Sequence, residues 1–116
     1  MKFIYKHPRI YDFLDSLITF GLNNKARKYV FKKLSGKILE VGVGTGKSSF
    51  FTRRELFGTD ISKPMLKLAE KKLKGKVKLA DSRKLPFKKN SFDWAIFIFS
   101  LPSENPEKAI KEALRV

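Results

Sequence analysis

Apolar and polar residues recur along this chain with two periods, one typical of helices and one of strands. Over residues 11–34 apolar side chains recur at helical spacing and Gly21 interrupts them, so the pattern predicts two helices joined by a turn at residues 21–24. Further along, the apolar residues come in short runs that fit buried strands better than helices. The predicted strands are residues 37–41, 56–59, 77–80 and 92–99.

Three further helices are predicted between and after these strands. A short one covers residues 47–54. A longer one begins after Ser62, whose hydroxyl is a good N-cap, and ends near Gly75. The last begins after Ser103 or Asn105. We expect its inward side to be formed by Ala109, Ile110, Ala113 and Leu114.

The alternation of strands and helices determines the expected fold class. It predicts a parallel sheet with right-handed crossovers and helices on both faces, which is an α/β fold. The continuous apolar character of residues 95–99 predicts that the strand of residues 92–99 is covered on both faces. A chain of 116 residues has room for one domain.

Charge is the most unusual feature of the composition. The net charge is +15, and Lys and Arg outnumber acids by eight to two in residues 1–36 and by eleven to two in residues 61–90. Such a surface attracts anionic partners, whether nucleic acid, anionic lipid or a phosphorylated substrate. A lysine-rich surface also keeps a protein soluble without binding anything, so the charge alone leaves both interpretations open.

The residue types that are missing narrow the function. Without Cys the chain has no disulfide, thiolate metal site or cysteine nucleophile, and with a single His we expect no metal. No apolar run approaches the ~18 residues of a transmembrane segment, and the N-terminal residues lack a secretory pattern, so we expect a cytoplasmic protein. Abundant Lys with no Gln or Cys favours a heat-adapted source, a thermophile.

A glycine-rich turn, residues 42–46, directly follows the first predicted strand. A turn of this kind between a strand and a helix brings backbone N–H groups against a ligand. A nucleotide-hydrolysing P-loop would match residues 46–48 but needs a glycine where Val41 stands. A dinucleotide site would need its third glycine at Lys47. Both matches are incomplete.

Two acids end neighbouring predicted strands, Asp60 the second strand and Asp81 the third. Open α/β sheets bind ligands at the carboxyl ends of their strands. Carboxylates accept hydrogen bonds from a ribose diol or an amine and repel a polyphosphate. Either acid alone could simply begin a turn. Together with the glycine-rich turn they favour a ligand that has a nucleoside and positive charge but no phosphate.

At this point the sequence resembles a known family. Residues 38–46, Ile-Leu-Glu-Val-Gly-Val-Gly-Thr-Gly, resemble the first motif of class I S-adenosylmethionine-dependent methyltransferases. Residues 60–66 resemble the helix opening that follows the family's ribose-binding acid, and residues 90–93 resemble its fourth motif. Tyr11, Asp12 and the helices after them resemble the lid of one subgroup, methyltransferase type 11, which methylates ubiquinone and menaquinone precursors, lipids and small molecules. The resemblance covers nearly the whole chain and corresponds to the family's N-terminal portion.

The resemblance implies a cofactor role for the first strand, the turn and the acid after the second strand. Glu40 would orient the ammonium group of S-adenosylmethionine, and Asp60 would bind its ribose hydroxyls. The backbone of the turn would pack against the methionine and ribose. The turn residues implied in binding are Gly42, Val43, Gly44, Thr45 and Gly46.

Further roles are implied around the adenine and the methyl group. Asp81 and Ser82 would read the adenine edge, with Ile61 against its face. Ser100 would face the transferred methyl, and Tyr11 would close over the cofactor carboxylate. The product would be S-adenosylhomocysteine, and no metal is implied.

The resemblance also implies an architecture. A Rossmann-like core of residues 37–116 would carry the strand order 3-2-1-4 under an N-terminal helical lid of residues 1–36. The family normally has seven strands and this chain supplies four, so residues 92–99 would form an uncovered edge. Because an apolar edge is an association hazard, we expect it to pair with a second copy in a homodimer, unless the sequence is a fragment.

The acceptor implied by the subgroup is a small or lipid-like molecule. Residues 100–103 do not match the Asn/Asp-Pro-Pro-aromatic signature used for exocyclic base amines, which disfavours nucleobase methylation. Two other functions stay open. One is a non-catalytic cofactor-binding or accessory subunit that associates through its fourth strand, and the other is a basic RNA-associated module.

Overall fold

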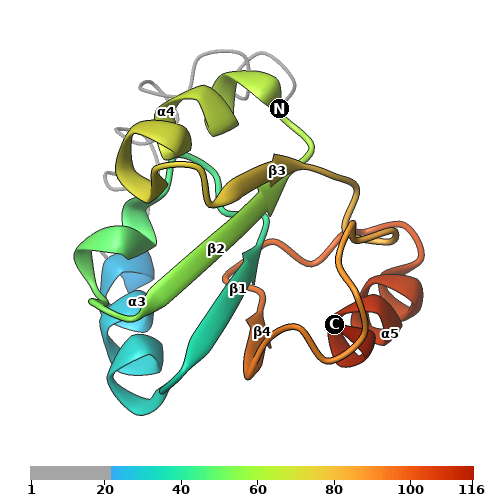
Figure 1. The fold of residues 1–116 in the computed structure, drawn as a ribbon, viewed down its shortest axis with the longest axis horizontal. Coiled ribbons are helices and arrows are strands. Elements are labelled where there is room, and N and C mark those ends of the chain that lie inside the picture. The colour runs from blue at the N-terminus through green and yellow to red at the C-terminus, as the bar shows by residue number, and fades with distance from the viewer. Residues whose placement is uncertain (1–21) are drawn as a thin grey trace.

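The computed structural model describes residues 22–116 (Figure 1). The first predicted helix and Tyr11 lie outside the described residues. Four parallel strands form one sheet in the order β3-β2-β1-β4, which confirms the predicted order. The strands are β1 (Lys37–Val41), β2 (Glu55–Asp60), β3 (Val77–Leu79) and β4 (Trp94–Ile96).

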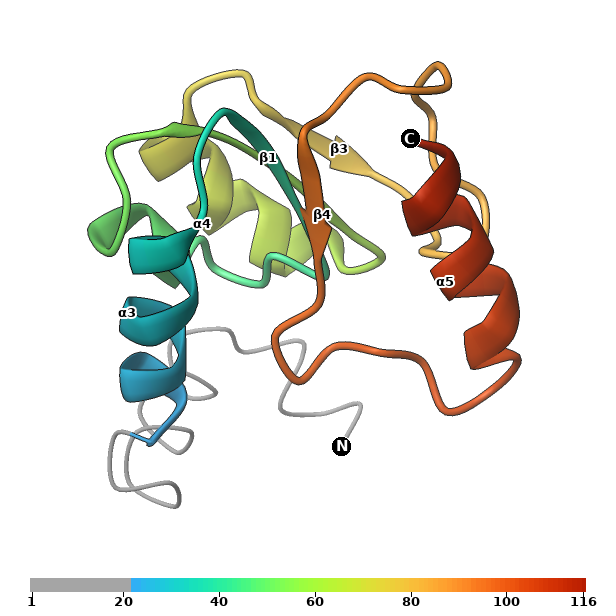
Figure 2. The ribbon, with the colours of Figure 1, turned by 90° about the horizontal axis from the view of Figure 1, so that it is seen from below.

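Helices lie on both sides of this sheet (Figure 2). Two helices and a short 3-10 helix cover one face, and the last helix covers the other. These elements are α3 (Leu22–Lys33), η1 (Lys47–Phe50) and α4 (Lys63–Leu73) on the first face, and α5 (Pro106–Arg115) on the second. The Rossmann-like α/β fold is therefore confirmed. None of the helices within residues 22–116 is long and apolar enough to cross a membrane.

The two-residue period of β1 separates the core into two clusters. Ile38 belongs to the cluster under α3 and α4, whereas Leu39 and Val41 belong to the cluster on the α5 side. The same period puts Glu40 on the side of Ile38. The larger cluster consists of Phe31, Leu34, Ile38, Val43, Leu56, Leu66, Ala69 and Leu73, and the smaller one of Leu39, Val41, Leu85 and Val116.

The fourth strand is shorter and more exposed than predicted. It covers Trp94–Ile96 instead of residues 92–99, and Trp94 is 47% exposed, so the prediction of a strand covered on both faces was wrong. Its only pairing within the described residues is with β1, over residues 94–96. Beyond it, Phe99 adopts a φ of 53°, which ends the extended backbone. The rest of the apolar run packs beside the sheet or borders the space at the strand ends.

Three helix predictions were wrong in detail. α3 begins at Leu22, inside the predicted turn, and η1 ends at Phe50 because the chain must extend to reach β2. α5 leaves Ile110 44% and Leu114 79% exposed, so these two side chains do not point inward. The buried side of α5 is centred on Ala109 instead. Asn105 is the N-cap residue of α5, but its side chain makes no capping hydrogen bond.

The close approach of β2 to the glycine-rich turn depends on Gly58, which the sequence analysis did not single out. A Cβ added to Gly58 would lie 2.6 Å from the Cβ of Val43. Val43 is 4% exposed and belongs to the larger core cluster. The missing side chain on β2 therefore lets the turn fold down onto the sheet and bury Val43.

We predict that Gly58→Ala lowers the free energy of unfolding by about 2–3 kcal/mol, because the added methyl overpacks a core contact. Gly44→Ala is the comparison variant, since its Cβ would meet nothing within 4 Å and only its φ of +59° is unfavourable. That strain costs about 1 kcal/mol. Urea denaturation of both variants measures the difference. Equal losses would mean that Val43 has room to move.

Candidate functional site

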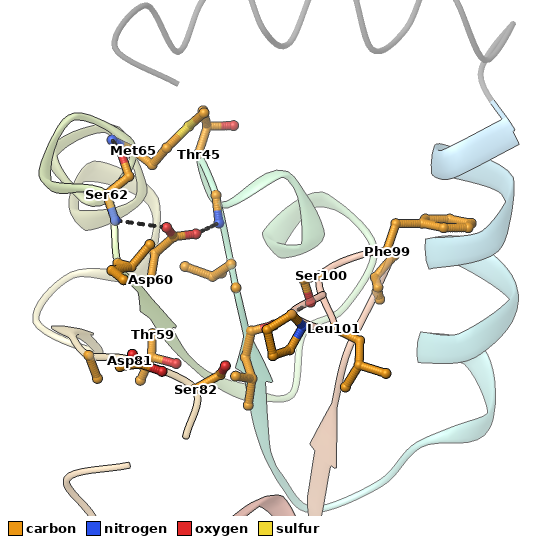
Figure 3. Close-up of a pocket in the computed structure, with 18 of the residues that line it drawn as sticks. Thr45, Thr59, Asp60, Ser62, Met65, Asp81, Ser82, Phe99, Ser100 and Leu101 are labelled. Atoms are coloured by element: carbon orange, nitrogen blue, oxygen red, sulfur yellow. Dashed lines mark hydrogen bonds between the residues drawn. The ribbon is translucent and has the colours of Figure 1, made fainter. Parts of the chain in front are cut away.

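A cleft of about 710 Å³ opens at the carboxyl ends of the strands and brings together most of the predicted site residues (Figure 3). Glu40 and Gly46 are buried beside it instead of lining it, and Tyr11 lies outside the described residues. The predicted residues that line the cleft are Gly42, Val43, Gly44, Thr45, Asp60, Ile61, Asp81, Ser82 and Ser100.

The glycine-rich turn is held against the ends of β2 and β4. The N–H groups of Gly42 and Val43 both donate to the Thr59 carbonyl at 2.8 Å. A Cβ on Gly42 would meet the Ser100 Cβ at 2.5 Å, and the Ser100 hydroxyl donates to a β1 carbonyl at 2.5 Å. At Gly44, where φ is positive, a Cβ would enter open space. The turn therefore leaves room for a ligand in front of its backbone.

Asp60 connects the turn to the start of α4. Its Oδ2 accepts the Gly44 N–H at 2.9 Å and its Oδ1 accepts the Ser62 N–H at 3.0 Å (Figure 3). Ser62 is also the N-cap of α4, as predicted. Because a carboxylate oxygen has two lone pairs, each oxygen of Asp60 keeps an acceptor position after making its bond to the backbone.

Asp81 is held by Arg83, a cleft residue that the sequence analysis missed. The guanidinium donates from Nε to Oδ1 at 3.0 Å and from Nη2 to Oδ2 at 2.7 Å, and the Arg83 backbone N–H donates to Oδ1 at 2.9 Å. These bonds lower the pKa of Asp81 to about 2, so the carboxylate is ionised at neutral pH. Oδ2 takes only one of the three bonds and can accept another.

Glu40 is an acid buried inside the protein, with 1% of its surface exposed. Burial raises the pKa of its carboxyl to about 7, while the nearby Ser48 hydroxyl, which makes no hydrogen bond of standard geometry, and the charge of Arg27 act in the opposite direction. Its Oε1 is buried and has no hydrogen-bond partner within the described residues. Since an unpaired buried acceptor is costly, this oxygen is poised to accept a donor or a positive charge.

Three more buried polar atoms of the described residues lack partners, and each comes from a different element. They are Nε of Arg27 on α3, Oγ of Ser48 on η1 and Oγ1 of Thr59 on β2. Arg27 and Thr59 also line the cleft. Buried polar atoms in native proteins are nearly always paired, so such a group marks a position built for a polar partner.

The cleft wall carries charges of both signs. Arg27, Lys47 and Arg83 line it together with Asp60 and Asp81. This mixture suits a zwitterionic ligand, and it weakens the argument from the sequence that the acids alone would repel a polyphosphate. Within residues 22–116 no group of three or more potential metal ligands comes together.

Sequence reasoning missed three functional positions in particular, Arg27, Arg83 and Phe99. Phe99 is 77% exposed in the cleft wall and is held at a positive φ, which is rare for an aromatic residue. The two-residue spacing of Asp81 and Arg83 could have suggested the ion pair between them. Nothing in the local pattern separates Arg27 from the lysines around it.

Comparison with known proteins identifies the family that this fold and site define. The family described as "Methyltransferase domain" matches residues 39–116. The chain therefore belongs to the class I S-adenosylmethionine-dependent methyltransferase family, as its motifs indicated.

Named relatives agree with this assignment. The chain is 32% identical over 117 residues to a demethylmenaquinone methyltransferase of Thermotoga maritima, a match covering 91% of this chain and 51% of the relative. It is 32% identical over 123 residues to a phosphatidylethanolamine N-methyltransferase of Cereibacter sphaeroides, which covers 97% of this chain and 60% of the relative. The chain thus spans about half the length of the curated relatives that it matches.

A solved structure shows the same arrangement. A SAM-dependent methyltransferase of Thermotoga maritima superposes with a TM-score of 0.70 at 26% identity. The match covers 99% of this chain and 56% of that one. The four strands of this chain are therefore a part of a larger fold in that protein.

We predict that Glu40→Gln removes a pH dependence of stability. Glu40 holds its proton more tightly when folded, at a pKa of about 7 against an ordinary 4.5, so the wild-type chain loses stability as the pH rises from 4.5 through 7. Above this range Glu40→Gln should be more stable by about 3 kcal/mol, and below it the two should converge. Urea denaturation at both ends of the range tests this, and a pH-independent difference would contradict it.

Proposed function

We propose that the cleft binds S-adenosylmethionine and that the protein containing this chain transfers the methyl group to a small or lipid-like acceptor. The observation that carries this proposal is the unpaired, buried oxygen of Glu40 behind a cleft lined by Asp60 and Asp81. S-Adenosylmethionine offers an ammonium group, a ribose diol and an adenine amine, and each is a donor suited to one of these acids.

In this proposal each donor of the cofactor is received by one acid. Glu40, which is buried beside the cleft, would orient the ammonium group directly or through a water molecule, and the remaining acceptor positions of Asp60 would receive the ribose hydroxyls. Oδ2 of Asp81 would accept the adenine amine, with the 72%-exposed Ile61 against the ring. Arg27, whose Nε lacks a partner, would bind the cofactor carboxylate. The role suggested for Tyr11, which lies outside the described residues, stays a prediction beside this one.

When bound, S-adenosylmethionine supplies an electrophilic methyl group, so the main task of the protein is to position an acceptor next to it. Two large apolar side chains in the cleft wall, Phe99 and Leu101, are 77% and 47% exposed. Exposed apolar surface beside a polar cofactor site suits an apolar acceptor. The demethylmenaquinone and phosphatidylethanolamine named for the relatives are lipid-like compounds and agree with this choice.

The edge of β4 has no second partner strand within the described residues, and we also propose that in this chain by itself the edge pairs with a second copy, whereas in a longer protein a further strand would take that place. The opposite edge, β3, carries Lys78 and is preceded by Lys76, and edge lysines block strand pairing. β4 itself carries no charged residue, the charge before it is the single acid Asp93, and Trp94 on it is half exposed. Since the strand is short, the apolar side chains beside it would supply much of the contact.

We predict micromolar or tighter binding of S-adenosylmethionine and S-adenosylhomocysteine by calorimetry, and loss of most of this affinity in Asp60→Ala. The substitution removes the ribose acceptor and also frees the Gly44 and Ser62 N–H groups that shape the cleft. Losing such charged hydrogen bonds should weaken binding about tenfold to a hundredfold.

Glu107→Ala is the matched control, because it removes an exposed acid of α5 away from the cleft. It should bind like the wild type, and circular dichroism should show both variants folded. Tight binding of ATP without binding of either cofactor form would overturn the proposal. Binding without methyl transfer to any quinone, lipid or amine acceptor would favour the non-catalytic subunit.

For the edge, we predict that Trp94→Lys weakens self-association by at least tenfold, because a charge on the strand would have to be desolvated. Leu79→Lys makes the same kind of change on the half-exposed opposite edge and should have no effect. Sedimentation equilibrium measures both. A wild-type chain that stays monomeric at high concentration would contradict the proposed pairing.

A further inference from the structure

Exposed cations gather on the layer that covers one face of the sheet. α3, the residues after η1, and α4 together carry eleven exposed Lys and Arg side chains, with Glu55 and Glu70 as the exposed acids nearby. We call this surface the basic face. Its cations are Lys25, Lys28, Lys32, Lys33, Arg53, Arg54, Lys63, Lys67, Lys71, Lys72 and Lys74.

The cations are placed on the outer sides of the two helices by sequence spacing. On α3 they recur at three-, four- and seven-residue intervals from Lys25, which is one stripe of an α-helix. On α4 they recur every four residues from Lys63 to Lys71, opposite the buried Met65, Ala69 and Leu73. Both helices lie on the same side of the sheet (Figure 2), and because their buried residues face the sheet, the exposed cations lie on their outer sides.

The opposite side of the molecule has no such excess. Residues 80–116, which include β4, α5 and the loop that packs against α5, contain seven Lys and Arg against five acids. The described part of the chain is therefore electrically uneven, with one strongly cationic face and one face of small net charge. A charge spread only for solubility would not need this asymmetry.

Two exposed aromatic rings lie among the cations of the basic face. Tyr29 on α3 is 65% exposed, and Phe50 at the end of η1 is 74% exposed. Lys33 Nζ lies 4.8 Å from the Tyr29 ring centroid and Lys72 Nζ lies 5.4 Å from that of Phe50. Aromatic rings flanked by lysines are the composition of surfaces that rest in the headgroup region of a bilayer.

We propose that the basic face docks onto an anionic lipid bilayer. Each cation near such a surface is attracted by its negative potential, and the two aromatic rings can enter the headgroup boundary. Nine of the eleven cations are Lys, a point charge, whereas base reading relies on the planar fork of Arg. These features favour a bilayer over RNA.

Docking of this face would also bring the cleft to the membrane. Arg27 of α3 and Ser62, the cap of α4, line the cleft and belong to the same layer as the basic face. An apolar acceptor could then reach the cleft from the bilayer without crossing much water. The docking proposal does not require the cofactor assignment, since it rests on surface charge and exposed rings alone.

The test is sedimentation of the chain with vesicles of phosphatidylcholine, alone or in an equimolar mixture with phosphatidylserine. We expect binding to the mixed vesicles at least tenfold tighter than to neutral ones, with affinity falling as salt is added. Replacing Lys28, Lys32, Lys67 and Lys71 by Gln should lower the affinity at least tenfold. The same replacement at Lys84, Lys88, Lys89 and Lys108, four exposed lysines outside the basic face, removes equal charge and should lower it less than threefold.

A second pair of variants tests whether the exposed ring of Phe50 contributes to binding. Phe50→Ser should weaken vesicle binding severalfold, whereas Leu114→Ser, which removes an exposed apolar side chain from α5, should leave it unchanged. Equal losses in the two lysine sets would overturn the proposal, because binding would then follow net charge. Tighter binding to single-stranded poly(U) RNA than to mixed vesicles at the same salt would also overturn it. Unchanged S-adenosylhomocysteine binding in all four variants would show that the cleft is intact.

Discussion

The position of the Asp60 carboxylate is the constraint on which the cleft depends. It accepts hydrogen bonds from Gly44 in the turn and from Ser62 at the start of α4, so one side chain fixes two backbone segments. Two residues earlier on β2, Gly58 leaves the space that Val43 fills. β2 therefore fixes the turn at two points, Gly58 and Asp60. The parallel register of β1 and β2 in turn fixes the start of the turn, because the turn directly follows β1. The shape of the ligand space follows from the sheet.

Much of this arrangement could be predicted, because parallel strands end at one edge and their acids must meet there. The bounds of β1, the strand order, the Ser62 cap and the positions of Asp60 and Asp81 all follow from that logic. The error at residues 92–99 has a physical cause. An apolar run signals burial, and burial beside a sheet edge or in a cleft wall gives the same pattern as a strand covered on both faces.

The missed residues are those whose roles depend on contacts between distant segments. Arg27 is one of several basic residues on α3, and only the packing of α3 against β1 distinguishes it from its neighbours. The sequence around Gly58 does not distinguish it from other glycines in strands, and its role is seen only from the contact that a Cβ there would make with Val43. On α5, the sequence does not show which apolar residues face the sheet, because Ala109 is buried while the equally apolar Ile110 and Leu114 are exposed. Predictions about Tyr11 and the lid of residues 1–36 stay predictions.

The unpartnered atoms of Arg27 and Glu40 belong to a helix and to a central strand, respectively. A molecule bridging them would add a bond between α3 and the sheet that the protein alone does not have. Occupancy and the opening of α3 would then be thermodynamically linked, so that the helix exchanges its amide hydrogens more slowly when the site is filled. By reciprocity, anything that holds α3 in place from outside would tighten the site, so that contacts on the outer side of this helix would control affinity in the cleft.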